Sequence, residues 1–147
     1  MKKYLLLLVL LFPATIVAQD LFMVRSEMSF PEAMTVLQEA IGKRPYKISR
    51  VQRVDIGLTK SGYATDKYRV VFFGDINELN LLSEQYPELV PYFPMKIAIF
   101  AEGDETILLA ASFAHLRPHY TSSSLQARFD KWENDILEIL EEVRTAQ

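Results

Sequence analysis

The spacing of apolar residues changes several times along the chain, and each change marks a predicted element. Residues 21–28 are mostly apolar, alternate at their far end and predict a first strand. Apolar positions at helical spacing follow from Phe30 to Ile41 and predict a helix. Ser29 and Glu32 have the spacing of a capping box at its start, and Gly42 ends it.

The middle of the chain predicts two strands separated by a loop. Residues 46–54 do not keep a strict period of two, which indicates a strand with a bulge. Residues 55–67 are rich in glycine, serine and threonine and predict a loop with one helical turn. Residues 68–73 are an almost continuous β-branched and aromatic run, which predicts a strand buried on both faces at the centre of the sheet. Asp75 is placed to cap a helix over residues 76–85.

The C-terminal half predicts a hairpin and a long helix. The proline-rich link at residues 86–94 is expected to be extended. Apolar runs at residues 96–101 and 106–113 flank a short turn with Gly103, which is typical of a β-hairpin. After a loop, a last helix carries one apolar stripe with alternating spacings of three and four residues, made of Leu125, Phe129, Trp132, Ile136, Ile139, Leu140 and Val143.

These elements predict an α+β fold. We expect a single compact domain over residues 19–147, with an antiparallel or mixed sheet of about four to five strands packed by about three helices. No linker is long enough to separate two domains.

The N-terminus predicts a signal peptide. Two lysines precede an unbroken apolar run, Tyr4–Phe12, and Pro13 ends that run. The run is much shorter than the roughly 20 residues that a helix needs to cross a bilayer. We therefore expect cleavage after Ala18, with residues 1–18 removed and the rest exported, periplasmic or secreted, without spanning the membrane. An uncleaved anchor is the alternative.

Composition excludes several classes of partner and site. The 147 residues include 16 basic and 19 acidic side chains, a net charge of −3, and loss of the two lysines of the signal peptide would make it −5. This acidic balance argues against a nucleic-acid partner, which requires a clustered basic face. The chain has no cysteine, which excludes disulfides, thiolate metal sites and cysteine nucleophiles.

Residues 62–113 carry a recognisable series of structural features: Gly62, a strand that ends at Gly74, a leucine-bearing helix and a proline-led strand at residues 94–100. In this series the chain resembles the bacterial family called domain of unknown function 302. The predicted helix at residues 29–41 also sits where that family has one. The resemblance implies a small α+β domain with helices packed on an antiparallel or mixed sheet, associated as a dimer. It implies no functional residue.

Four residues are candidates for ligand binding. Tyr92 and Trp132 are aromatic residues of the type that lines apolar pockets, and we expect such a pocket between the sheet and the last helix. The alternative is that Trp132 is simply part of the core. His115 and His119 are the only histidines, but Pro118 disfavours the helix that would place them on one face, so no metal site and no cofactor are predicted.

Three functions remain open from the sequence. The first is a non-enzymatic binding domain of the cell envelope that takes a small apolar molecule or another envelope protein. The second is a small hydrolase or isomerase with a site formed by the loops at residues 55–66 and 115–120, which hold most of the polar residues that capping does not explain. The third is a structural homodimer that associates through the last helix or an edge strand.

Overall fold

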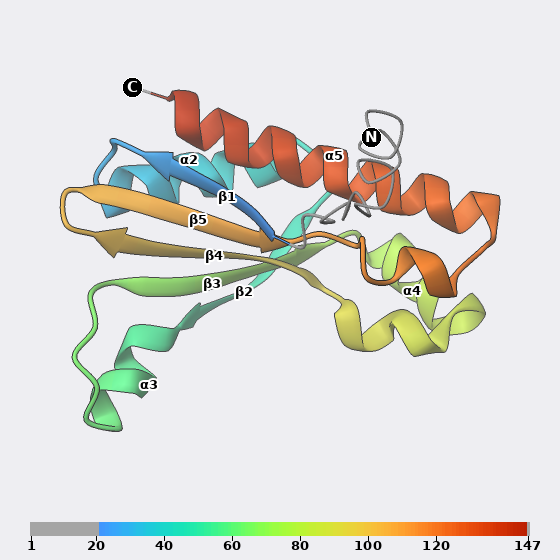
Figure 1. The fold of residues 1–147 in the computed structure, drawn as a ribbon, viewed down its shortest axis with the longest axis horizontal. Coiled ribbons are helices and arrows are strands. Elements are labelled where there is room, and N and C mark those ends of the chain that lie inside the picture. The colour runs from blue at the N-terminus through green and yellow to red at the C-terminus, as the bar shows by residue number, and fades with distance from the viewer. Residues whose placement is uncertain (1–20, 147) are drawn as a thin grey trace, which may run out of the picture.

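The computed structural model describes residues 21–146, so the predicted signal peptide lies outside the described residues. Figure 1 shows a sheet flanked by helices. The elements, in chain order, are β1 (Leu21–Ser26), α2 (Phe30–Gly42), β2 (Lys47–Arg53), α3 (Val54–Lys60), β3 (Tyr68–Gly74), α4 (Ile76–Gln85), the 3-10 helix η2 (Pro87–Tyr92), β4 (Met95–Glu102), β5 (Glu105–Ala111), the 3-10 helix η3 (Arg117–His119) and α5 (Ser123–Thr145). The predicted α+β fold is confirmed, with one α-helix more than expected.

The five strands form one antiparallel sheet in the order β1-β5-β4-β3-β2. The prediction that residues 68–73 form the central strand is wrong, because β4 is central and β3 lies next to the edge strand β2. Only one face of β3 is fully buried: Val71 and Phe73 are inaccessible, whereas Val70 and Phe72 are partly exposed. A continuous apolar run therefore does not require protein layers on both faces.

Helices α2 and α5 contact each other and cover one face of the sheet. The alternate residues Val71, Ile97 and Leu108 point to this face and are fully buried. The apolar stripe of α5 is buried as well, from Leu125 to Val143. The last helix therefore offers no exposed apolar stripe of the kind that the homodimer hypothesis considered for its interface.

Local sequence signals explain most element boundaries. The backbone N–H of Ser29 donates to Glu32 Oε2 at 3.1 Å, which completes the expected contact at the start of α2. Gly103 adopts a φ of +61° in the hairpin turn, where a side chain would be strained. The register of β2 against β3 shifts between Ile48 and Arg50, as the irregular apolar spacing predicted.

Two connections are more regular than expected. Residues 54–60 form the seven-residue helix α3 in place of a loop with a single turn, and α3 has no buried residue. It projects beyond the end of β2 and β3 at the lower left of Figure 1. The prediction of an extended proline link is wrong, since residues 87–92 form η2, in which the fixed φ of proline is compatible with a helical turn.

Among residues 21–146 no helix is both long and apolar enough to span a membrane.

Candidate functional site

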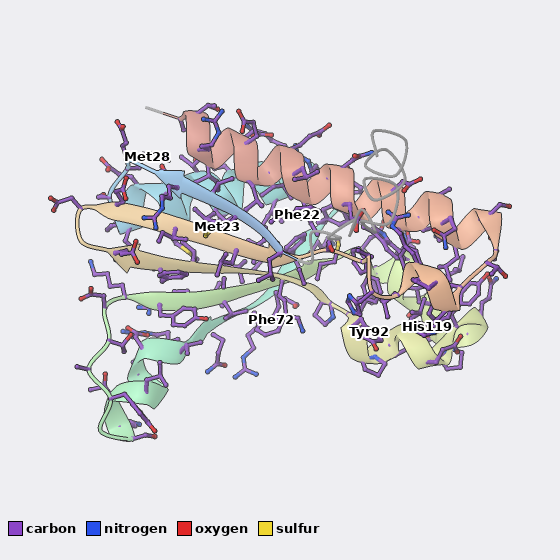
Figure 2. The ribbon with its side chains drawn as sticks, viewed as in Figure 1. Phe22, Met23, Met28, Phe72, Tyr92 and His119 are labelled. Atoms are coloured by element: carbon purple, nitrogen blue, oxygen red, sulfur yellow. The ribbon has the colours of Figure 1, made fainter. Side chains whose placement is uncertain are left out.

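The face of the sheet opposite α2 and α5 is the main candidate surface. Directly paired residues of an antiparallel sheet share a face, so the register places Phe72 beside Lys96 and Val70 beside Ala98. The same rule places Met23 beside Leu109. We call this surface the open face, and its apolar members are Leu21, Met23, Tyr68, Val70, Phe72, Ala98, Phe100, Ile107, Leu109 and Ala111. Figure 2 shows Phe72 on the side of the sheet away from α5.

Most apolar residues of the open face are at least partly accessible within the described part of the chain, whereas Ile107 is buried. Leu21 and Met23 are 55% and 58% exposed. Tyr68 and Phe100 pack their rings against each other at 5.5 Å between centroids, and both remain partly exposed. Contiguous exposed apolar patches larger than a few hundred Å² mark interaction surfaces, whereas single exposed apolar residues do not.

Charged groups form the rim of this face. Arg25 on β1 donates to Glu102 at 2.6 Å and to Glu105 at 3.0 Å, which links the edge of the sheet to the hairpin turn. Arg50 on β2 is exposed at the opposite edge, where it pairs in register with Phe72. An apolar centre with a polar, solvated rim is the usual composition of a protein interface.

A second hollow lies at α3, but most of the residues that line it are exposed to solvent. It has a volume of about 680 Å³ and lies between α3 and residues 65–67. Its lining includes Ile56, Lys60 and Asp66, which are all exposed. Asp55 is directed to Arg69, and the hydrogen bond from that guanidinium holds the pKa of the carboxyl group below its usual range. Asp55 is already paired, and the other charged residues that line the hollow are exposed to solvent, which makes it a poor catalytic or ligand site.

A third feature is a small pocket at the end of the sheet where β4 begins and β5 ends. Its volume is about 70 Å³. We call it the Tyr92 pocket, and its lining residues are Tyr92, Met95, Lys96, Ala111, Ser112, Phe113, His115 and Ile136. Tyr92 and His115 are in ring contact, with 5.8 Å between the centroids. Two of the four residues expected from sequence thus line one pocket between the sheet and α5.

The other two candidates lie elsewhere. Trp132 is 1% exposed and packs against Phe93, Phe113 and Phe129. It therefore belongs to the core, which was the alternative to a role in ligand binding. His119 is exposed on η3 at the same end of the molecule as Tyr92, as Figure 2 shows, but it does not line the pocket. The polar residues Lys96 and Ser112 were not among the candidates. Only the sheet register shows that β4 and β5 bring them together.

Partly buried polar contacts hold the segment that carries His115. The backbone N–H of Phe113 donates to Glu133 on α5 at 2.6 Å. Arg117 donates to the other oxygen of Glu133 at 2.6 Å and forms an ion pair with Asp130 at 2.8 Å. These bonds fix the chain on both sides of His115 against α5, so the pocket wall does not depend on a free loop.

The structure separates the two loops of the enzyme hypothesis. Residues 54–67 connect β2 to β3 at the end of the sheet where Tyr68 pairs with Phe100. Residues 112–122 follow β5 at the other end, where Ala111 pairs with Leu21. Figure 1 shows α3 and the end of β5 at opposite ends of the sheet. The shared site that this hypothesis requires does not form.

Comparison with known proteins supports the fold and the family. The crystal structure of an uncharacterized conserved protein DUF302 from Bacillus stearothermophilus matches with a TM-score of 0.76 and 14% sequence identity. The match covers 86% of this chain and 100% of that one. At this identity it establishes the fold alone. No curated protein matches the sequence. Residues 22–143 match the family described as domain of unknown function DUF302, and the chain therefore belongs to that family.

Proposed function

We propose that this chain is an exported, non-enzymatic binding domain that uses the open face to bind another polypeptide, in the first place a second copy of itself. One observation carries the proposal: most outward residues of β1, β3, β4 and β5 are apolar, and within residues 21–146 all of these apolar residues except Ile107 stay at least partly exposed. Removing such residues from water would be favourable by about 25 cal/mol per Å² of apolar area. A partner layer would supply the same cover that α2 and α5 give the opposite face.

The size of the open face is compatible with a protein partner. The sheet has five strands. With a spacing of about 4.8 Å between strands and roughly 3.3 Å per residue along them, a face seven residues long has an area of about 500 Å². Specific complexes bury about 800 Å² on each partner. At about 500 Å² the open face is smaller than this, and two copies would bury roughly 1,000 Å² in total, which is the range of weak or transient complexes.

The geometry also suits self-association. Two twisted sheets pack face to face with their strands within about 30° of each other. A two-fold axis in the interface would bring the open face of one copy onto the same face of the other, which is the commonest arrangement of soluble oligomers. Val70, Phe72 and Phe100 would then be desolvated, while Arg25 and Arg50 would stay at the rim.

Native mass spectrometry of the chain purified from an exported fraction tests this proposal. We expect the mass of two copies, each beginning at Gln19. The substitution Phe72→Glu places a charge in the open face and is expected to give a monomer, because a buried unpaired carboxylate is costly. Leu137→Glu is the matched control, since Leu137 is 44% exposed on α5, outside the open face, and should leave the dimer intact.

A photo-crosslinking amino acid at position 72 distinguishes the partners. A cross-link between two copies supports self-association, and a cross-link to a different polypeptide supports the general proposal but not the homodimer. The same label at position 137 should capture neither. A monomer that yields no cross-link from position 72 would overturn the proposed function, and a chain that still begins at Met1 would overturn export with cleavage.

A further inference from the structure

The Tyr92 pocket has a chemical composition that the open face does not share. Its floor is apolar and closed, formed by Met95, Phe113 and Ile136, which are at most 6% exposed. Its lining also includes the exposed residues Tyr92, Lys96 and His115. No aspartate or glutamate is among the described residues that line it. The pocket therefore combines an apolar floor with hydrogen-bond donors and a positive charge.

These donors are not used inside the chain. Within residues 21–146 the ammonium group of Lys96 and the ring nitrogens of His115 make no hydrogen bond or ion pair. Most other cations near α5 have partners: Arg117 binds Glu133 and Arg44 binds Glu142. An unused cation beside an apolar floor fits an anion with an apolar end.

The volume limits the size of the ligand. A water-sized sphere needs about 10–15 Å³ of this kind of volume, so 70 Å³ holds roughly five to seven such spheres. That is the size of a carboxylate with about two to four carbon atoms. A larger aromatic acid would not fit without movement of the core residues below.

We propose that the Tyr92 pocket binds a short-chain carboxylate. The carboxylate would lie between the ammonium group of Lys96 and the donors of Tyr92 and His115, with its alkyl end on Met95 and Phe113. The hydrogen bonds of Glu133 to Phe113 and Arg117 hold this wall in place before a ligand arrives. This binding site does not rest on the proposed function, because it requires no second copy, although Lys96 lies beside Phe72 on the open face.

Titration of the purified chain with propionate, followed by two-dimensional amide NMR, tests the proposal. We expect saturable shifts in the millimolar range that are confined to residues of the pocket. Propionamide has nearly the same shape without the charge and should bind at least about tenfold more weakly, since hydrogen bonds to charged groups are the stronger ones. Benzoate should bind more weakly than propionate because it exceeds the volume of the pocket.

Three variants locate the binding groups. Lys96→Met keeps most of the apolar stem but removes the ammonium group, and it should weaken propionate binding by about tenfold to a hundredfold. His115→Phe keeps the ring contact with Tyr92 but removes the donor, and a smaller loss is expected. Lys60→Met removes a lysine at the far end of the sheet and should change nothing. Equal binding of propionate and propionamide, no saturable shift with propionate, or unchanged affinity in Lys96→Met would each overturn the proposal.

Discussion

Tyr46 connects three elements through a single side chain. Its hydroxyl group hydrogen-bonds Asp135 on α5 and lies 3.3 Å from the ammonium group of Lys131. Its ring meets Phe73 on β3 edge to face, with 5.5 Å between centroids. Burial, followed by the hydrogen bond to Asp135, raises the pKa of Tyr46, so its hydroxyl group stays protonated and donates. This contact fixes α5 to the end of the sheet where β2 begins.

Tyr46→Phe is therefore expected to lower the free energy of unfolding by about 0.5–1.5 kcal/mol, because it removes the hydroxyl donor to Asp135 while the ion pair of Asp135 with Lys131 and the ring packing remain. Urea denaturation at neutral pH measures the change. Tyr63→Phe serves as the control, since Tyr63 is 66% exposed and its loss of a hydroxyl group should change stability by less than about 0.5 kcal/mol. Equal stability of both variants and the unmodified chain would contradict this role of Tyr46.

Ion pairs join α2 to α5 at the other end of the last helix. Lys43 lies 2.8 Å from Glu142, and Arg44 lies 2.9 Å from the other oxygen of the same carboxylate and 3.0 Å from Glu138. The hydrogen bond from Lys43, followed by the one from Arg44, holds the pKa of Glu142 below its usual range. A carboxyl group with a lowered pKa in the folded state stabilises the fold above its unfolded pKa, and that stabilisation is lost as the pH falls through the folded value.

Glu142→Gln should then destabilise the protein by about 0.5–1 kcal/mol at pH 7, the range of partly exposed ion pairs. The difference from the unmodified chain should shrink once the pH falls below about 4, where the carboxylate of the unmodified chain is protonated too. Thermal unfolding at several pH values measures this. Glu84→Gln, on an exposed position of α4, is the control and should show no pH-dependent difference. A difference that stays constant down to pH 3 would rule out the ion pairs as its source.

Features that depend on residues close together in the chain could be predicted from the sequence. The start of α2 depends on Ser29 and Glu32, and the hairpin turn depends on the positive φ of Gly103, all encoded within a few residues. The place of β3 could not be predicted in the same way. The apolar run around Phe72 shows only that both of its faces favour burial, and the sequence does not say whether the second cover comes from this chain.

The candidate site could be predicted only in part, because its residues come together through contacts between distant parts of the chain. Tyr92 and His115 were selected by residue type, but their proximity depends on where η2 and the segment after β5 meet in space. Trp132 lies on the helical stripe, and that spacing correctly places it in the core. Lys96 looks like an ordinary outward residue of a strand, and only the pairing of β4 with β5 brings it beside Ala111 at the pocket. Non-local contacts of this kind leave no signal in a single sequence.

Residues 21–146 form two layers, one of helices and one of strands, in which α2 and α5 cover one side of the strand layer. If the open face associates as proposed, folding and association are coupled, and the melting temperature depends on protein concentration. A tenfold dilution should lower it by about 3–5 °C for a dimer of this size. Scanning calorimetry at several concentrations measures this. Phe72→Glu should melt at one temperature at all concentrations, and a concentration-independent melting temperature of the unmodified chain would count against self-association.

The irregular register of β2 has a consequence for how such assemblies can grow. An unpaired strand edge accepts a further strand from any neighbour, and each addition exposes a new edge, so edge contacts lead to fibres. The shift between Ile48 and Arg50 breaks the even spacing of backbone donors and acceptors that an added strand needs. Contact through a face has no such continuation, because a two-fold pair uses up the surface that formed it. If the chain associates as proposed, the bulge disfavours growth through the β2 edge and so favours closed pairs over open-ended polymers at that edge.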